Sequence, residues 1–127
     1  MKIYSEEMES SDLFDPDVLL SFDRSDMILP PHLKLRPLKI TDNKLGFLEL
    51  LAQLTKVGDI DDEMFKQRFD NMKKTKCYYV MVVSDQNQED KIIGTATLIL
   101  EQKFIRMCAI KGRVEEVFLI LYIIKTR

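Results

Sequence analysis

Runs of apolar residues in the second half of the chain predict three consecutive strands. Residues 78–83 and 92–101 are rich in β-branched and aromatic residues, and a third run at 113–117 leads into an apolar tail. The link at 84–90 is polar, as is typical of a hairpin connection. We therefore expect these three segments to be neighbours in one sheet.

The first half of the chain predicts one more strand and two helices. Apolar and polar residues alternate over 33–38, and Pro37 places that strand at an edge or an end of the sheet. Leucines then recur at helical spacing up to residue 54. Thr41 is the expected N-cap of this helix, and Gly58 is expected to stop it.

The second helix is expected to begin near Asp61, whose carboxylate can accept hydrogen bonds from free backbone N–H groups. Phe65, Phe69 and Met72 form a stripe on its buried face, and a Lys73-Lys74 pair suits the negative end of its dipole. Strands combined with two helices indicate an α/β domain and exclude a helix bundle.

Composition limits the domain organisation and the classes of partner. A chain of 127 residues with a 46% hydrophobic share has room for one domain, which we expect at 32–127. Residues 1–31 are acidic and serine-rich and are expected to be a loose leader that docks one short turn. The net charge of -2 and the lack of a basic stripe argue against nucleic acid as a partner.

Neither a secretory signal nor a membrane helix is expected. The longest apolar run, 117–124, is far shorter than the roughly 20 residues that a membrane helix needs. Cys77 and Cys108 have the spacing of neither a disulfide framework nor a zinc site, so no metal is expected. The single histidine, His32, lies far in sequence from the acidic residues described next and is expected at the surface. These features predict a cytoplasmic protein.

Positive charge gathers beside a pair of carboxylates in the last third of the chain. Lys103, Arg106, Lys111 and Arg113 precede the adjacent residues Glu115 and Glu116. Cations next to carboxylates could bind a ligand that carries both an anionic group and an amine. From these residues alone a solvated connecting loop is the favoured interpretation, because basic residues are common in loops. Strand alternation sends the two glutamates to opposite faces, so only one of them would point at a given ligand.

Several of these segments together resemble a known family. The resemblance is carried by 13–16, 35–38, 54–58, 94–101, 103–106 and 111–117. They are similar to eukaryotic glucosamine 6-phosphate N-acetyltransferases, members of the GNAT superfamily. The resemblance implies the N-terminal part of the GNAT acyl-CoA N-acyltransferase fold, with a mixed, mostly antiparallel sheet and two early helices.

The resemblance also implies a reaction and a site. The family transfers acetyl from acetyl-CoA to the amine of D-glucosamine 6-phosphate, on the route to UDP-N-acetylglucosamine. Glu115 and Glu116 are the implied catalytic residues, and the backbone of Glu116 and Val117 would hold acetyl-CoA. Arg106 stands where many members carry histidine and keeps a positive charge for the phosphate. The implied substrate contacts are Thr55, Lys103, Phe104, Ile105, Arg106, Glu115, Glu116 and Val117.

After Val117 the chain departs from the family pattern. Members continue with a basic, glycine-rich loop for the CoA pyrophosphate, whereas no glycine follows Gly112 here. We therefore expect a C-terminally truncated domain with little activity alone, in which Tyr122 is a strand residue and not a catalytic acid. The resemblance also implies a homodimer. The alternative function is a non-catalytic module that binds sugar phosphate or pairs with other subunits.

Overall fold

An antiparallel sheet forms the centre of the molecule. The computed structural model describes residues 11–20 and 29–119. Within them, four strands lie in the order β1-β2-β3-β4, and every neighbouring pair is antiparallel. The expected strands are confirmed, and those from β2 onward are longer than predicted. The strands are β1 (Leu33–Pro37), β2 (Tyr78–Asp85), β3 (Lys91–Gln102) and β4 (Ile110–Leu119).

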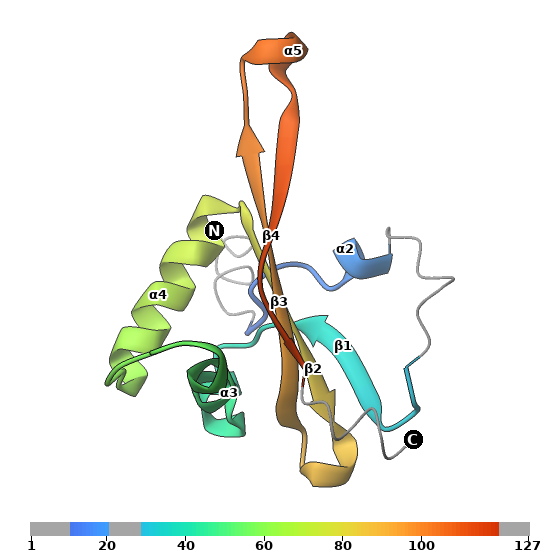
Figure 1. Cartoon of the computed structure of the whole chain (residues 1–127), viewed down its shortest axis with the longest axis vertical. Helices are drawn as coiled ribbons and strands as arrows, with labels where there is room; N and C mark the ends of the chain where they lie inside the picture. The colour runs from blue at the N-terminus through green and yellow to red at the C-terminus, as the bar shows by residue number, and fades with distance from the viewer. Residues whose placement is uncertain (1–10, 21–28, 120–127) are drawn as a thin grey trace, which may run out of the picture.

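Helices flank this sheet (Figure 1). α3 and α4 lie together on one side of the sheet, and the short α2 lies on the other side in this view. The hairpin link between β2 and β3 contains a 3-10 turn, η2. The bounds are α2 (Asp17–Leu20), η1 (Asp42–Leu45), α3 (Phe47–Leu54), α4 (Asp62–Thr75), η2 (Gln86–Gln88) and α5 (Ile105–Cys108). Parts of the predicted leader, at 1–10 and 21–28, and the tail at 120–127 lie outside the described residues.

The first predicted helix is divided in two, and Thr41 does not cap it through its side chain. Gly46 has φ +90° and separates the 3-10 turn η1 from α3. Because a left-handed residue cannot continue a right-handed helix, the regular turn starts anew after Gly46. At the other end, α3 stops at Leu54, before the left-handed Gly58 (φ +84°), so Gly58 is not the residue that ends it.

The second predicted helix, α4, is confirmed. The Asp61 carboxylate accepts a hydrogen bond from the Met64 N–H at 2.8 Å, as an N-cap does. Phe65 and Phe69 are buried, and the Lys73-Lys74 pair lies in the last turn. The apolar stripe therefore holds α4 on the sheet, and its termini are stabilised as the sequence predicts.

The main core lies between the helices and one face of the sheet. Phe47 and Leu50 of α3 and Phe69 of α4 pack with Val80 and Val82 of β2. Leu13, from the predicted leader, joins this core. Its side chain is only 3% exposed, and its N–H donates to the Leu38 carbonyl at 2.8 Å. A smaller cluster of Leu33, Ile93 and Val83 packs separately.

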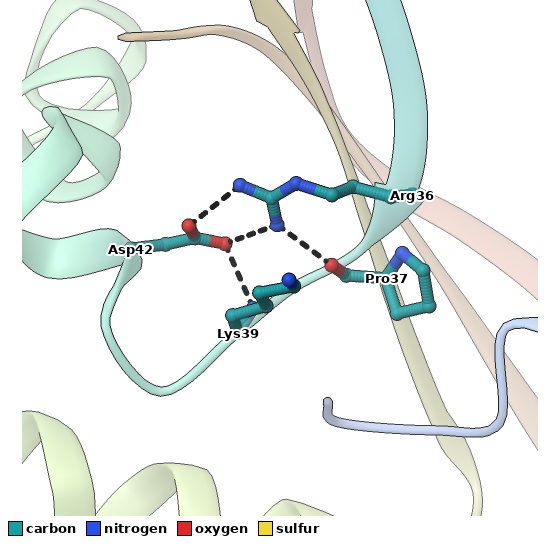
Figure 2. Close-up of polar contacts among 4 residues, drawn as sticks. All are labelled: Arg36, Pro37, Lys39 and Asp42. Atoms are coloured by element: carbon teal, nitrogen blue, oxygen red, sulfur yellow. Dashed lines mark hydrogen bonds and ion pairs between the residues drawn. The ribbon is translucent and has the colours of Figure 1, made fainter. Parts of the chain in front are cut away.

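A buried ion pair joins β1 to the turn before α3 (Figure 2). Two Arg36 guanidinium nitrogens each donate to an Asp42 carboxylate oxygen at 2.8 Å. The Lys39 N–H donates to the same carboxylate at 2.7 Å, and Arg36 also donates to the Pro37 carbonyl at 3.0 Å. Asp42 is fully buried, so its charge depends on these donors alone for the solvation that water would otherwise provide.

β3 and β4 continue as a two-stranded hairpin beyond the body of the molecule (Figure 1). The connecting loop expected between the second and third predicted strands is shorter than predicted, because residues at both of its ends belong to β3 and β4. Gln102 pairs with Ile110 and Glu101 with Lys111, so only the short α5 and its flanking residues form a tip. We call residues 103–109 the hairpin tip.

Candidate functional site

The backbone of the hairpin tip changes handedness within a few residues. Phe104 is right-handed (φ -85°, ψ -31°), whereas Arg106, Met107 and Cys108 all have φ between +50° and +61°. The Cys108 N–H donates to the Phe104 carbonyl at 3.2 Å, and the Ala109 N–H donates to the Ile105 carbonyl at 3.2 Å. A switch from right-handed to left-handed residues turns successive N–H groups into a concavity that suits an anion.

Basic side chains surround this turn. An open hollow of about 640 Å³ is lined by Lys103, Arg106 and Lys111 together with apolar neighbours from the same hairpin. Its described lining comes from this hairpin alone. The cations that the sequence suggested for an anionic ligand are thus brought together here, with the exception of Arg113, which lies further along β4.

A carboxylate that the sequence analysis did not single out organises two of these cations. Glu101 accepts from Lys103 Nζ at 3.0 Å and from Arg113 Nε at 3.2 Å. The hydrogen bond and charge of Lys103, followed by the charge of Arg113, lower the pKa of the Glu101 carboxyl. The sequence places Lys103 two residues from Glu101, but the approach of Arg113 depends on the pairing of β3 with β4.

Glu101 should respond to acid in a defined direction. Its folded-state pKa is depressed, so its contribution to stability is complete above the ordinary glutamate pKa and disappears as pH falls through the depressed value. Carboxyl ¹³C NMR titration should therefore show Glu101 titrating below a glutamate in an unstructured peptide. Lys103→Gln should raise that pKa because Lys103 is the largest cause. An unchanged Glu101 pKa in the variant would refute the assignment.

The other predicted substrate residues lie away from the tip. Thr55 is the exposed C-cap of α3, in extended conformation, and its N–H donates to the Leu51 carbonyl at 3.0 Å. α3 packs against β3 and β4. In Figure 1, α3 lies beside the lower half of the sheet, whereas α5 lies beyond its upper end. The structure therefore does not bring Thr55 together with the residues at 103–106 within one chain.

A β-bulge occurs on β4 where the sequence placed the catalytic residues. Thr95 pairs with Phe118 and Thr97 with Glu115, so β4 has one more residue than β3 between these two pairs. The bulge therefore interrupts the regular ladder between β3 and β4 over Glu115 to Phe118. β4 is also an edge strand of the described sheet, which leaves backbone groups available to a ligand.

The tip also exposes large apolar side chains. Phe104 is 95% exposed, Ile105 is 68% exposed and Met107 is 97% exposed. Phe104 and Ile105 are among the substrate contacts that the resemblance implies, whereas Met107 is not. A cluster of exposed apolar residues on a protruding element is typical of a surface that another molecule covers.

Two kinds of site have no candidate within the residues that the structure describes. No helix among them is both long and apolar enough to cross a membrane. Across residues 11–20 and 29–119, no three His, Cys, Asp or Glu side chains are grouped closely enough to hold a metal ion.

The sequence is similar to several curated proteins, although no family model matches it. It is 42% identical over 121 residues to a probable glucosamine 6-phosphate N-acetyltransferase of Drosophila melanogaster, covering 86% of this chain and 55% of the relative. It is 38% identical over 84 residues to the glucosamine 6-phosphate N-acetyltransferase of Arabidopsis thaliana, covering 66% of this chain and 56% of the relative. The chain thus spans about half the length of these curated relatives.

Solved structures show the same fold. The glucosamine-6-phosphate N-acetyltransferase of Arabidopsis thaliana superposes with a TM-score of 0.66 at 35% identity, over 68% of this chain and 59% of that one. An acetyltransferase of Trypanosoma brucei superposes with a TM-score of 0.61 at 28% identity, over the same shares. The described fold is therefore that of a GNAT acetyltransferase. Within that class, the chain is a homologue of the glucosamine 6-phosphate N-acetyltransferases.

Proposed function

We propose that this chain contributes the sugar-phosphate half of a glucosamine 6-phosphate N-acetyltransferase. The observation that carries the proposal is the hairpin tip, where a left-handed turn lies among Lys103, Arg106 and Lys111. A phosphate monoester would accept hydrogen bonds from the turn and from these cations. Glu101 holds Lys103 in place at 3.0 Å, which lowers the entropic cost of binding.

The acetyl-transfer chemistry would take place at the bulge of β4. In the proposed reaction the free amine of glucosamine 6-phosphate attacks the thioester carbonyl of acetyl-CoA, and Glu115 or Glu116 accepts the proton that the amine loses. The tetrahedral intermediate then collapses, the C–S bond breaks, and CoA leaves as its thiolate. Backbone N–H groups at Glu116 and Val117 would stabilise the developing oxyanion and hold the pantetheine arm. An edge strand with a bulge fits this part of acetyl-CoA, because its backbone groups are not all used by the sheet.

Thr55 and the hairpin tip are both implied substrate contacts, yet they lie apart within one chain. We propose that the tip of one chain reaches a second copy, so that Thr55 and the basic turn meet between two subunits. The exposed Phe104 and Met107 would be buried in that contact. The same observation favours a second candidate function, in which the chain is a non-catalytic module that pairs with other subunits. A cytoplasmic location is proposed with the reaction.

Titration with the substrate tests the first proposal. We expect glucosamine 6-phosphate to shift the amide resonances of Lys103 and Arg106, whereas glucosamine without phosphate should bind much more weakly. Lys103→Gln should weaken binding about tenfold, since it removes one charge-assisted hydrogen bond. Lys91→Gln is the matched control, because Lys91 is an exposed lysine at the opposite end of β3.

The same samples discriminate the alternatives. Equal binding of both sugars, or an unaffected Lys103→Gln variant, would contradict a phosphate site at the tip. Sedimentation as a dimer without any ligand binding would support the subunit-pairing function instead. In a coupled assay for CoA release we expect little or no turnover by these 127 residues alone.

A further inference from the structure

A second hollow is formed by elements other than β4 and the hairpin tip. It has a volume of about 440 Å³ and lies between the segment around Asp12 and Phe14, the C-terminal turn of α4 and the start of β2. That volume falls in the range of small-molecule sites. None of the residues that line it belongs to the hairpin tip or to β4. Nothing in the proposed acetyl transfer uses it.

One wall of this hollow is aromatic. The rings of Phe14 and Tyr79 pack edge to face, with centroids 5.1 Å apart and an interplanar angle of 65°. Both side chains are only half-buried, although Leu13 between Asp12 and Phe14 is almost completely buried. A rigid aromatic pair at the side of a hollow offers a flat apolar surface for a planar ring.

The charged residues of the lining come from two separate elements. Lys73 and Lys76 belong to the end of α4, whereas Asp12 and Asp15 belong to the N-terminal segment. Cations can bind a phosphate, and carboxylates can accept hydrogen bonds from an amino group. A ligand that suits all four residues must therefore be anionic in one part and a hydrogen-bond donor in another.

Lys76 has a backbone conformation that favours glycine. It is the C-cap of α4, with φ +58° and ψ +27°, and its N–H donates to the Met72 carbonyl at 3.4 Å. Left-handed C-caps are usually glycine, since a Cβ is disfavoured there. A lysine that keeps this conformation at the rim of a hollow is an outlier of the kind that marks ligand sites.

We propose that this hollow binds a mononucleotide. The base would lie against Phe14 and Tyr79, its exocyclic amino group would donate to the aspartates, and its phosphate would bind the two lysines. The proposal does not depend on the acetyltransferase reaction, because it uses a different set of residues.

Titration of the whole chain with AMP tests this site. We expect saturable shifts of the Tyr79 ring and the Lys76 amide, with a Kd tighter than about 1 mM. Adenosine lacks the phosphate, UMP lacks the amino group, and inorganic phosphate lacks the base together with its amino group. Each should bind at least fivefold more weakly, roughly half of the free energy of one charge-assisted hydrogen bond. Glucosamine 6-phosphate should not displace AMP, so failure here and failure at the hairpin tip are distinguishable.

Lys76→Gly separates binding from folding. Glycine should relieve the left-handed strain and raise Tm by roughly 3 °C, yet it should weaken AMP binding about tenfold. A purely structural lysine would give the rise in Tm with no change in binding, which would overturn the proposal. Lys73→Gln should also weaken AMP binding. The control is Lys74→Gln, because Lys74 is an exposed neighbour that does not line the hollow, and it should leave binding unchanged. Absence of AMP shifts, or displacement of AMP by glucosamine 6-phosphate, would equally refute the site.

Discussion

Replacement of Asp42 by alanine is expected to lower the free energy of unfolding by about 3–5 kcal/mol. The substitution removes the acceptor of three hydrogen bonds and leaves the Arg36 guanidinium, whose side chain is only 20% exposed, without its counter-charge. The cost comes mainly from the unpaired charge and the unpaired Lys39 N–H, both of which water can reach only poorly. Chemical denaturation of the wild-type and variant chains measures the difference.

Two further variants test whether the loss comes from the buried ion pair or from removal of any carboxylate. Asp62→Ala removes an exposed carboxylate that accepts from Asn43 at 2.8 Å, and it should cost less than about 1 kcal/mol. Arg36→Met combined with Asp42→Leu should recover part of the loss, because it removes both charges together. A loss below about 1 kcal/mol for Asp42→Ala would show that the pair contributes no more than a surface contact.

The second large effect is expected at Phe69 of α4. This side chain is 2% exposed and packs against Phe65, with ring centroids 6.3 Å apart, in the main core. Phe69→Ala should therefore destabilise the fold by about 3–5 kcal/mol through lost burial and the cavity left behind. Thermal unfolding followed by circular dichroism measures the change.

Met64→Ala is the matched control for Phe69, because Met64 lies on the same helix and is 52% exposed. Its truncation should change the free energy of unfolding by less than about 0.5 kcal/mol. If the two variants had similar stability, the burial of the α4 stripe would not be what holds this helix on the sheet.

The strands and α4 were predictable because one local pattern decided each of them. Tyr78–Asp85 is rich in β-branched and aromatic residues. α4 begins after the capping residue Asp61 and carries an apolar stripe along its length. The division of the first helix was harder to predict. Leucine spacing continues across Gly46, and only the φ of that glycine shows that the helix is interrupted.

The Arg36–Asp42 pair could not be predicted from spacing. The two residues are six positions apart, on a strand and a turn, and their contact depends on how Pro37 to Thr41 bend back. The length of the β3–β4 hairpin was missed for a related reason. The segment after Gln102 has basic residues and a glycine, which resemble a loop locally, yet cross-strand pairs such as Glu101 with Lys111 extend the ladder.

The candidate site was predictable in its residue types and less so in its arrangement. Lys103 and Arg106 do gather at one turn, as their proximity in sequence suggested. Thr55 lies elsewhere, since no local pattern tells how far a hairpin extends from the body. The left-handed run from Arg106 to Cys108 has no sequence signal, because none of its residues is glycine or asparagine.

The extra residue in β4 also constrains how this strand can change over time. Substitutions between Glu115 and Phe118 keep the count of residues and hence the alignment with β3. Deletion of a single residue there would remove the bulge and make the ladder regular, and the residues on either side could keep both their partners on β3 and their faces. In the regular part of β4 the same deletion would move every residue beyond it to the opposite face of the sheet, so this strand should tolerate a change of length at the bulge and not elsewhere.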